Sequence, residues 1–162
     1  MNLKSRKEIP ANIIARLVEL ATISLEMLDV PVAAVLLYNG EIIGEGFNSV
    51  ARNNSAGEHA EINAITGAIR GLGMEKFSRL DRSSLVLVST FEPCLKCVGA
   101  CVQYNVRTVF YLQEKEQRDL LWERYMVTRY FFRRRQVKNN GEQISLFKLH
   151  PEYSSQAVSS KK

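Results

Sequence analysis

The chain has 162 residues, of which 46% are hydrophobic and 24% are charged, and its formal net charge is +5. This composition favours one globular domain with a sizeable core, and the longest apolar run, residues 30–38, is too short to span a bilayer. No apolar signal segment follows the basic N-terminus, and three cysteines make no disulfide framework, so we expect a cytoplasmic protein with no membrane partner.

The first half of the chain predicts a helix and a hairpin. Apolar residues recur at helical spacing over residues 9–28. The nearly continuous apolar run of residues 32–38 has the length of a buried strand. Asn39-Gly40 is a strong hairpin signal, so residues 41–47 are expected to return antiparallel. The polar residues 48–57 are predicted to form a loop.

The middle of the chain alternates helices and strands. A helix is predicted over residues 59–69, ended by Gly71 and Gly73, and a charged connector over residues 74–83. The next elements are a strand, a helix and a strand, predicted at residues 85–90, 94–104 and 106–112. Strand–helix–strand crossovers imply parallel neighbours, whereas the hairpin adds an antiparallel pair. The predicted fold is therefore α/β, a three-layer α/β/α arrangement around a mixed sheet.

Beyond residue 112 we predict a helix over 114–134 and a fifth strand over 144–149. The predicted organisation is one domain over residues 1–153, with a mostly five-stranded sheet, and a flexible tail over 154–162. Arginines gather in one segment in and directly after the predicted helix, at Arg124, Arg129, Arg133, Arg134 and Arg135. They indicate either a surface that faces a polyanion or a solvated helix face.

Two short stretches carry metal-binding chemistry. Glu58-His59-Ala60-Glu61 supplies one imidazole, and Glu92-Pro93-Cys94-Leu95-Lys96-Cys97 supplies two thiols. Three such ligands with an open fourth position make a catalytic zinc site, whereas a structural site closes all four positions. We predict that His59, Cys94 and Cys97 hold one Zn²⁺ per chain. Each motif is expected to start a helix, so two helix N-termini would face one ion.

Glu61 is a carboxylate that need not bind the metal. Zinc lowers the pKa of a bound water to about 7, and Glu61 can take the proton from that water. Glu61 can then pass the proton to a ring nitrogen and to leaving ammonia. These roles predict a hydrolytic deaminase that acts on the C–N bond of a cyclic amidine. The alternatives are a zinc-stabilised RNA-binding module without catalysis, and a redox or zinc-ribbon role for the Cys-x-x-Cys pair.

Cys101 lies four residues after Cys97, on the same helix face, and could in principle close a four-ligand site. It sits about 5–6 Å deeper along the helix than Cys97, within an apolar stripe. We therefore favour a buried free cysteine that packs as a small hydrophobic side chain.

The residues His59-Ala60-Glu61 and Pro93-Cys94-Leu95-Lys96-Cys97 match the zinc deaminase signature H-x-E…P-C-x-x-C. With the segments around them, the chain resembles the cytidine/deoxycytidylate deaminase superfamily over about residues 8–112. Within that superfamily it looks most like the branch of tRNA-adenosine deaminases and guanine deaminases. The resemblance implies a cytidine deaminase-like fold and assembly as a homodimer.

The resemblance also implies substrate contacts for Asn48, which follows Gly46-Phe47, and for Ala60 and Pro93. Asn48 could instead simply terminate the strand. Our best prediction of the reaction is adenosine to inosine in tRNA, since residues 130–136 are similar to the aromatic and arginine-rich ending of tRNA-adenosine deaminases. The alternative is a free base or nucleoside: guanine, cytosine or cytidine.

Overall fold

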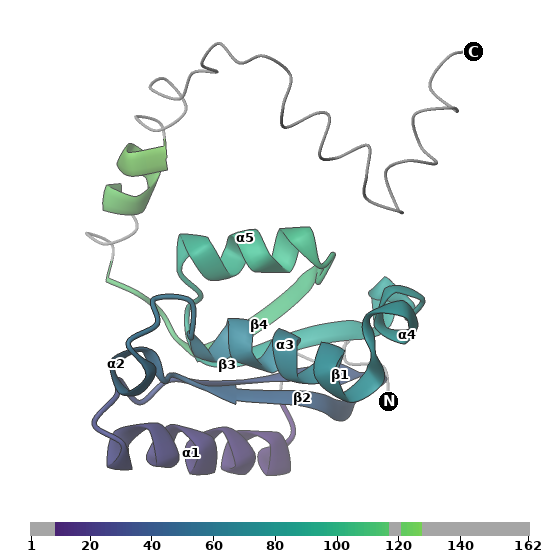
Figure 1. The fold of residues 1–162 in the computed structure, drawn as a ribbon, viewed down its shortest axis with the longest axis horizontal. Helices are drawn as coiled ribbons and strands as arrows, with labels where there is room; N and C mark the ends of the chain where they lie inside the picture. Colours follow the sequence, from purple (N-terminus) through teal and green to yellow (C-terminus); the bar gives the residue numbers. More distant parts are fainter. Residues whose placement is uncertain (1–8, 117–120, 128–162) are drawn as a thin grey trace. The chain divides into compact units, whose positions relative to one another are not determined.

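The fold is known from a computed structural model that describes residues 9–116 and 121–127. The chain divides into two compact units, Met1–Glu123 and Arg124–Lys162, and the candidate site lies in the first. Its elements, shown in Figure 1, are α1 (Ala11–Glu26), β1 (Ala33–Tyr38), β2 (Glu41–Phe47), α2 (Val50–Asn53), α3 (Ala60–Leu72), α4 (Met74–Ser78), the 3-10 helix η2 (Arg82–Ser84), β3 (Leu85–Phe91), α5 (Leu95–Gln103) and β4 (Thr108–Gln113). None of the helices in the described ranges is both long and apolar enough to cross a bilayer.

The described strands form one mixed sheet in the order β2-β1-β3-β4. β1 runs antiparallel to both of its neighbours, β2 and β3, and β3 runs parallel to β4. Figure 1 shows α1 on one face of this sheet and α3 and α5 on the other. The predicted α/β fold with a mixed sheet is confirmed, with four strands in the described residues rather than five. Residues 144–149, the expected fifth strand, lie outside the described residues.

Successive residues of β1 and β3 alternate between two hydrophobic clusters, because side chains of a pleated strand point to opposite faces. The cluster under α3 and α5 includes Ala34, Leu36, Leu85, Leu87, Ile65 and Cys101. The cluster under α1 includes Ile13, Leu17, Val35, Leu37, Val86 and Val88. A sheet covered on both faces explains why these strands are apolar at nearly every position.

The β1–β2 hairpin is confirmed at the predicted turn. Asn39 has φ 53° and Gly40 has φ 89°, so both central residues occupy the left-handed region. Such turns match the right-handed twist of the strands that they join. The hairpin register pairs Ala33 with Phe47, and this pairing brings Asn48 to the edge of the candidate site.

Helix α3 packs directly on the backbone of β2. A Cβ atom added at Gly44 would lie 2.7 Å from the Ala68 backbone N, and one added at Gly46 would lie 2.5 Å from the Ala64 backbone N. Neither approach leaves room for a methyl group. The two glycines therefore set how closely α3, and the site residues at its N-terminus, approach the sheet.

We expect Gly46→Ala to lower the free energy of unfolding by about 1–3 kcal/mol, since overpacking forces the backbones of β2 and α3 apart. Urea denaturation followed by circular dichroism measures this loss. Gly71→Ala is the matched control, because a Cβ at Gly71 meets nothing within 4 Å. Alanine within a helix should raise stability there by about 0.5–1 kcal/mol. Equal effects of the two substitutions would contradict the close approach.

Two segments predicted to lack regular structure contain short helices. The prediction of a loop over residues 48–57 is wrong at α2, whose N-terminal amides donate to the Asp29 carboxylate from Ala51 and Arg52, at 2.8 and 3.0 Å. The predicted connector over 74–83 contains α4, which is held by a single buried aromatic, Phe77. Asp29 is distant from α2 in the sequence, and Phe77 is the one buried residue of α4. Neither feature produces the repeating apolar pattern by which a helix is predicted from sequence.

Helix boundaries differ in detail from the predictions. Helix α3 runs through Gly71 and ends at Gly73, whose φ of 82° suits glycine. The predicted helix over 114–134 does not begin at 114, because residues 114–116 are not helical, whereas residues 121–127 are. Its remaining residues, and the segments predicted at 144–149 and 154–162, lie outside the described residues. The single domain over 1–153 stays a prediction.

Candidate functional site

Two helices point their N-termini at one place. His59 immediately precedes α3 with φ −77° and ψ 150°, and Cys94 immediately precedes α5 with φ −73° and ψ 166°. Both are extended residues whose carbonyls accept the first helical hydrogen bonds, from Asn63 N and Val98 N, each at 2.9 Å. Their side chains therefore project beyond the helix ends. Cys97 lies within the first turn of α5 and is fully buried.

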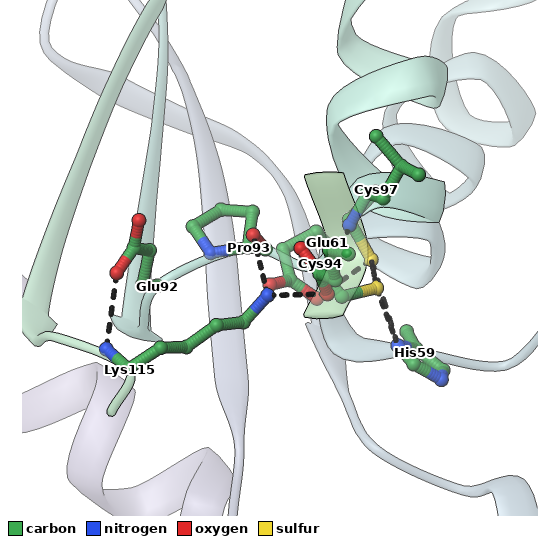
Figure 2. Close-up of polar contacts among 9 residues, drawn as sticks. His59, Glu61, Glu92, Pro93, Cys94, Cys97 and Lys115 are labelled. Atoms are coloured by element: carbon green, nitrogen blue, oxygen red, sulfur yellow. Dashed lines mark hydrogen bonds and ion pairs between the residues drawn. The ribbon is translucent and has the colours of Figure 1, made fainter. Parts of the chain in front are cut away.

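The three predicted metal ligands meet, as Figure 2 shows. His59 Nδ1 lies 3.5 Å from Cys94 Sγ and 3.6 Å from Cys97 Sγ, and the two sulfurs are 3.5 Å apart. Tetrahedral zinc, with Zn–S of about 2.3 Å and Zn–N of about 2.0–2.1 Å, would hold such atoms about 3.5–3.8 Å apart. The donor set and its spacing therefore fit zinc.

The thiols of Cys94 and Cys97 interact directly, with their sulfurs 3.5 Å apart. This contact lowers the pKa of Cys94 and raises the pKa of Cys97 above its ordinary range. Cys94 is therefore the more acidic thiol of the pair. Zinc binds the deprotonated form of cysteine, so a bound ion would displace the thiol protons.

Cys101 is a core residue in this structure. It is 4% exposed and belongs to the hydrophobic cluster under α3 and α5. Burial raises the pKa of Cys101 to about 11, so its thiol stays protonated. Within the described residues, the candidate metal ligands are His59, Cys94 and Cys97. Cys101 does not belong to this group. These three ligands leave one tetrahedral position for a small molecule.

Glu61 turns its carboxylate toward the ligand cluster. Its side chain is 3% exposed, and Oε2 lies 3.3 Å from Cys97 Sγ. Its other oxygen, Oε1, accepts a long hydrogen bond from the Ser89 hydroxyl of β3, at 3.4 Å. Ser89 is itself fully buried, and its hydroxyl contacts the Glu61 carboxylate from β3. Glu61 is thus a nearly buried acid beside the candidate metal position.

A cavity of about 270 Å³ opens in front of this cluster. Its polar lining includes His59, Glu61, Cys94, Asn48, Glu92 and Lys115, and its apolar lining includes Val30, Val32, Val50, Ala60 and Phe91. Apolar walls with a few convergent polar groups are typical of small-molecule sites. Pro93 lines a different cavity, of about 540 Å³, together with residues of α5 and β4.

Asn48 is held in a fixed orientation. Its Nδ2 donates to Asp29 Oδ1 at 3.2 Å, and Asn48 is 7% exposed. The same Asp29 carboxylate accepts the two amides at the start of α2. Asn48 lines the cavity, and a side-chain amide can both donate and accept a hydrogen bond. Its predicted substrate contact, like those of Ala60 and Pro93, stays a prediction.

Sequence reasoning missed three side chains near the site: Asp29, Ser89 and Lys115. Asp29 directly precedes the Val30-Pro31 turn into β1, and Lys115 follows the end of β4. Polar residues just outside strands are a usable signal, because the ends of strands commonly carry functional groups. Ser89 had no such signal, since it lies within an apolar strand.

A family model described as the cytidine and deoxycytidylate deaminase zinc-binding region matches residues 8–113. A tRNA-specific adenosine deaminase of Buchnera aphidicola (subspecies Baizongia pistaciae) is 41% identical over 92 residues, which are 56% of this chain and 54% of that protein. The guanine deaminase of Bacillus subtilis is 36% identical over 84 residues, 52% of this chain and 51% of that protein. The chain spans about half the length of these curated relatives.

Two solved structures are similar to the fold. The guanine deaminase of Bacillus subtilis superposes with a TM-score of 0.66 at 27% identity, covering 93% of this chain and 96% of that one. A structure from work on A-to-I editing by tRNA:A34 deaminases at the wobble position of transfer RNA has a TM-score of 0.57 at 30% identity. It covers 64% of this chain and 76% of that one.

Proposed function

This chain belongs to the cytidine and deoxycytidylate deaminase zinc-binding family, and from that premise we propose that it is a zinc-dependent hydrolytic deaminase of an amino-substituted nucleobase. The observation that carries the proposal is the convergence of His59, Cys94 and Cys97 beside the Glu61 carboxylate. Three ligands leave room for a water, and a nearly buried acid stands within reach of it.

Bound zinc supplies a water whose pKa is lowered to about 7, which makes it a nucleophile near neutral pH. Glu61 accepts a proton from the attacking water and delivers it to a ring nitrogen of the base. The water oxygen forms the new C–O bond. Glu61 then takes the remaining proton from that oxygen and gives it to the exocyclic amine, whose C–N bond breaks as ammonia leaves. The Ser89 hydroxyl lies 3.4 Å from Glu61 Oε1 and 3.3 Å from the Ala33 carbonyl, so its one proton is shared between these two acceptors.

The cavity walls suit a flat base. Phe91 and three valines provide apolar surface, and Phe91 is 38% exposed, so its ring is accessible for stacking. Asn48 offers an acceptor and a donor from an amide that Asp29 holds in place. A base placed on this apolar surface, with its edge at Asn48, turns its amino carbon toward the ligand cluster.

The favoured substrate is adenosine in tRNA, converted to inosine. Relatives described as tRNA-specific adenosine deaminases are 32–41% identical to the chain over 83–98 residues. The net charge of +5 suits a polyanionic partner. The arginine cluster of the sequence lies largely outside the described residues, so the role of residues 129–135 in RNA binding stays a prediction.

A free base, with guanine first, is the second candidate substrate. The guanine deaminase structure of Bacillus subtilis aligns with nearly the whole chain, 93%, and has the higher TM-score of the two structures compared. A cavity of about 270 Å³ is sufficient to hold one base. A free base also needs no arginine cluster.

An ammonia-release screen across free bases, nucleosides, nucleotides and a tRNA anticodon stem-loop separates these candidates. For a tRNA substrate we expect release only with the stem-loop, and binding that weakens steeply between 50 and 200 mM salt, roughly 10³-fold or more for six phosphate contacts. Release from free guanine at a rate indifferent to salt would establish the second candidate. No ammonia from any of these substrates would refute the deaminase.

The enzyme is proposed to act as a homodimer in the cytoplasm. One surface of α5 exposes Leu95, Val98 and Val102, of which Val102 is 75% exposed, and the apolar cavity of about 540 Å³ lies beside it. An apolar stripe of this kind is typical of an interface between proteins. Sedimentation of the purified protein at several concentrations tests the assembly, and a single species of about 18 kDa would contradict it.

A further inference from the structure

Lys115 is a nearly buried cation beside the candidate metal centre, and the reaction described above gives it no role. Its side chain is 10% exposed and lines the cavity. Its Nζ donates to the Pro93 carbonyl at 3.1 Å and pairs with Glu123 Oε1 at 2.8 Å, and Figure 2 shows it reaching past Pro93. A buried lysine loses side-chain entropy and hydration, so its two partners must hold it firmly.

The residues on both sides of Cys94 are hydrogen-bonded to the end of β4 or to the chain that follows it. Glu92 N donates to Gln113 O at 2.8 Å, and Glu92 Oε2 accepts from Lys115 N at 3.0 Å. The Pro93 carbonyl accepts from Lys115 Nζ. On the other side of Cys94, Leu95 N points at Glu123 Oε1 at 3.5 Å. We call Lys115 and Glu123 the clasp, since together they hold both sides of Cys94.

Cys94 needs such support. It precedes α5 without a side-chain capping bond, and its backbone is extended, so its sulfur follows the position of the loop around it. The ligand spacing that fits zinc requires Cys94 Sγ to stay 3.5 Å from both His59 Nδ1 and Cys97 Sγ. Partners behind the metal ligands orient them and raise the affinity for the metal.

The two charges of the clasp complement each other. A carboxylate at the first turn of α5 is favourable for the helix dipole, but Glu123 alone would place an unbalanced negative charge beside the Glu92–Leu95 loop. Lys115 neutralises that charge. Lys115 alone, without Glu123, would be an unpaired cation in a nearly buried position. The residues therefore work as a pair.

We propose that Lys115 and Glu123 are positioning residues for the zinc site, which fix the Glu92–Leu95 loop so that Cys94 is already in place when the metal binds. This inference rests on the proposed zinc centre. Lys115 and Glu123, which are not among the three grouped ligands, would then set the affinity for the metal and the geometry at Cys94.

The test is zinc affinity of the full chain, measured by competition with a chromophoric chelator. We expect Lys115→Met and Glu123→Gln each to weaken zinc binding by about 10- to 100-fold. The double substitution should weaken it by less than the product of the two, since the residues act as a pair. Lys115→Arg should recover part of the loss. Lys76→Met, at an exposed lysine of α4, is the matched control and should change nothing.

A second readout separates positioning from general stability. With cobalt(II) in place of zinc, the thiolate-to-metal absorption should weaken or shift in the clasp variants, while the urea midpoint of the metal-free protein changes little.

Wild-type affinity and spectrum in both clasp variants would overturn the inference and leave the zinc site intact. Equal loss in Lys76→Met would also overturn it. If the wild-type chain itself binds no zinc through His59, Cys94 and Cys97, the proposed function fails instead. Should Lys115→Met not fold, Glu123→Gln and Lys115→Arg decide the question.

Discussion

Glu61→Gln should lower the rate of ammonia release by about 10²- to 10⁴-fold, the usual contribution of a positioned general acid–base group. Glutamine keeps the volume of the side chain and can still accept from the Ser89 hydroxyl, so the site should keep its shape. It cannot take a proton from water or deliver one to the base. Zinc content, measured by atomic emission, should stay at one ion per chain.

The control for this substitution is Glu75→Gln, which removes an exposed carboxylate from α4. We expect it to leave both activity and zinc content unchanged. If Glu61→Gln loses zinc and folding together, Glu61 supports the structure of the cluster and the non-catalytic zinc module becomes the better interpretation. Unchanged activity with full zinc would assign the proton transfers to another group.

Cys97→Ala should remove zinc from the protein, with at least about a 100-fold loss of affinity, larger than the loss from partners that do not touch the metal. Cys97 is fully buried and supplies one of the three candidate ligands, so its removal leaves only His59 and Cys94 to hold the ion. Activity should fall with the metal. Chelator competition and ammonia release, measured on the same preparation, check both effects.

Cys101→Ala is the matched control, four residues further along α5. Because Cys101 packs in the core and is not one of the grouped ligands, its variant should keep one zinc per chain. We expect it to lower the free energy of unfolding by on the order of 1 kcal/mol, for the small cavity that it leaves. Equal loss of zinc in the two variants would identify a closed, structural cluster.

The chemistry of the site could be predicted because one histidine and a Cys-x-x-Cys pair, with a glutamate two residues after the histidine, are typical of a catalytic zinc site. An imidazole and a Cys-x-x-Cys pair predicted three ligands, and the structure brings their donor atoms to 3.5–3.6 Å. The strands could be predicted because β1 and β3 are buried on both faces and so read as continuous apolar runs. The hairpin followed from Asn39-Gly40, whose left-handed geometry only a few residues adopt.

The missed features depend on contacts between distant residues. Helix α2 exists because Asp29 accepts its first amides across more than 20 positions of sequence. Lys115 approaches Pro93 only after β4 has paired with β3. Neither contact produces a periodic pattern or a motif, so the sequence alone indicates the ligands but not the residues that orient them.

The candidate ligands lie 35 residues apart in the sequence, at His59 and Cys94, with β3 between them. An ion held by both motifs would therefore close a long loop of chain, in the way that a cross-link does. β3 lies within this loop and pairs with β1 in the central sheet. An ion that binds both motifs would therefore also favour the paired state of these strands, because a ligand that binds only the folded chain stabilises it.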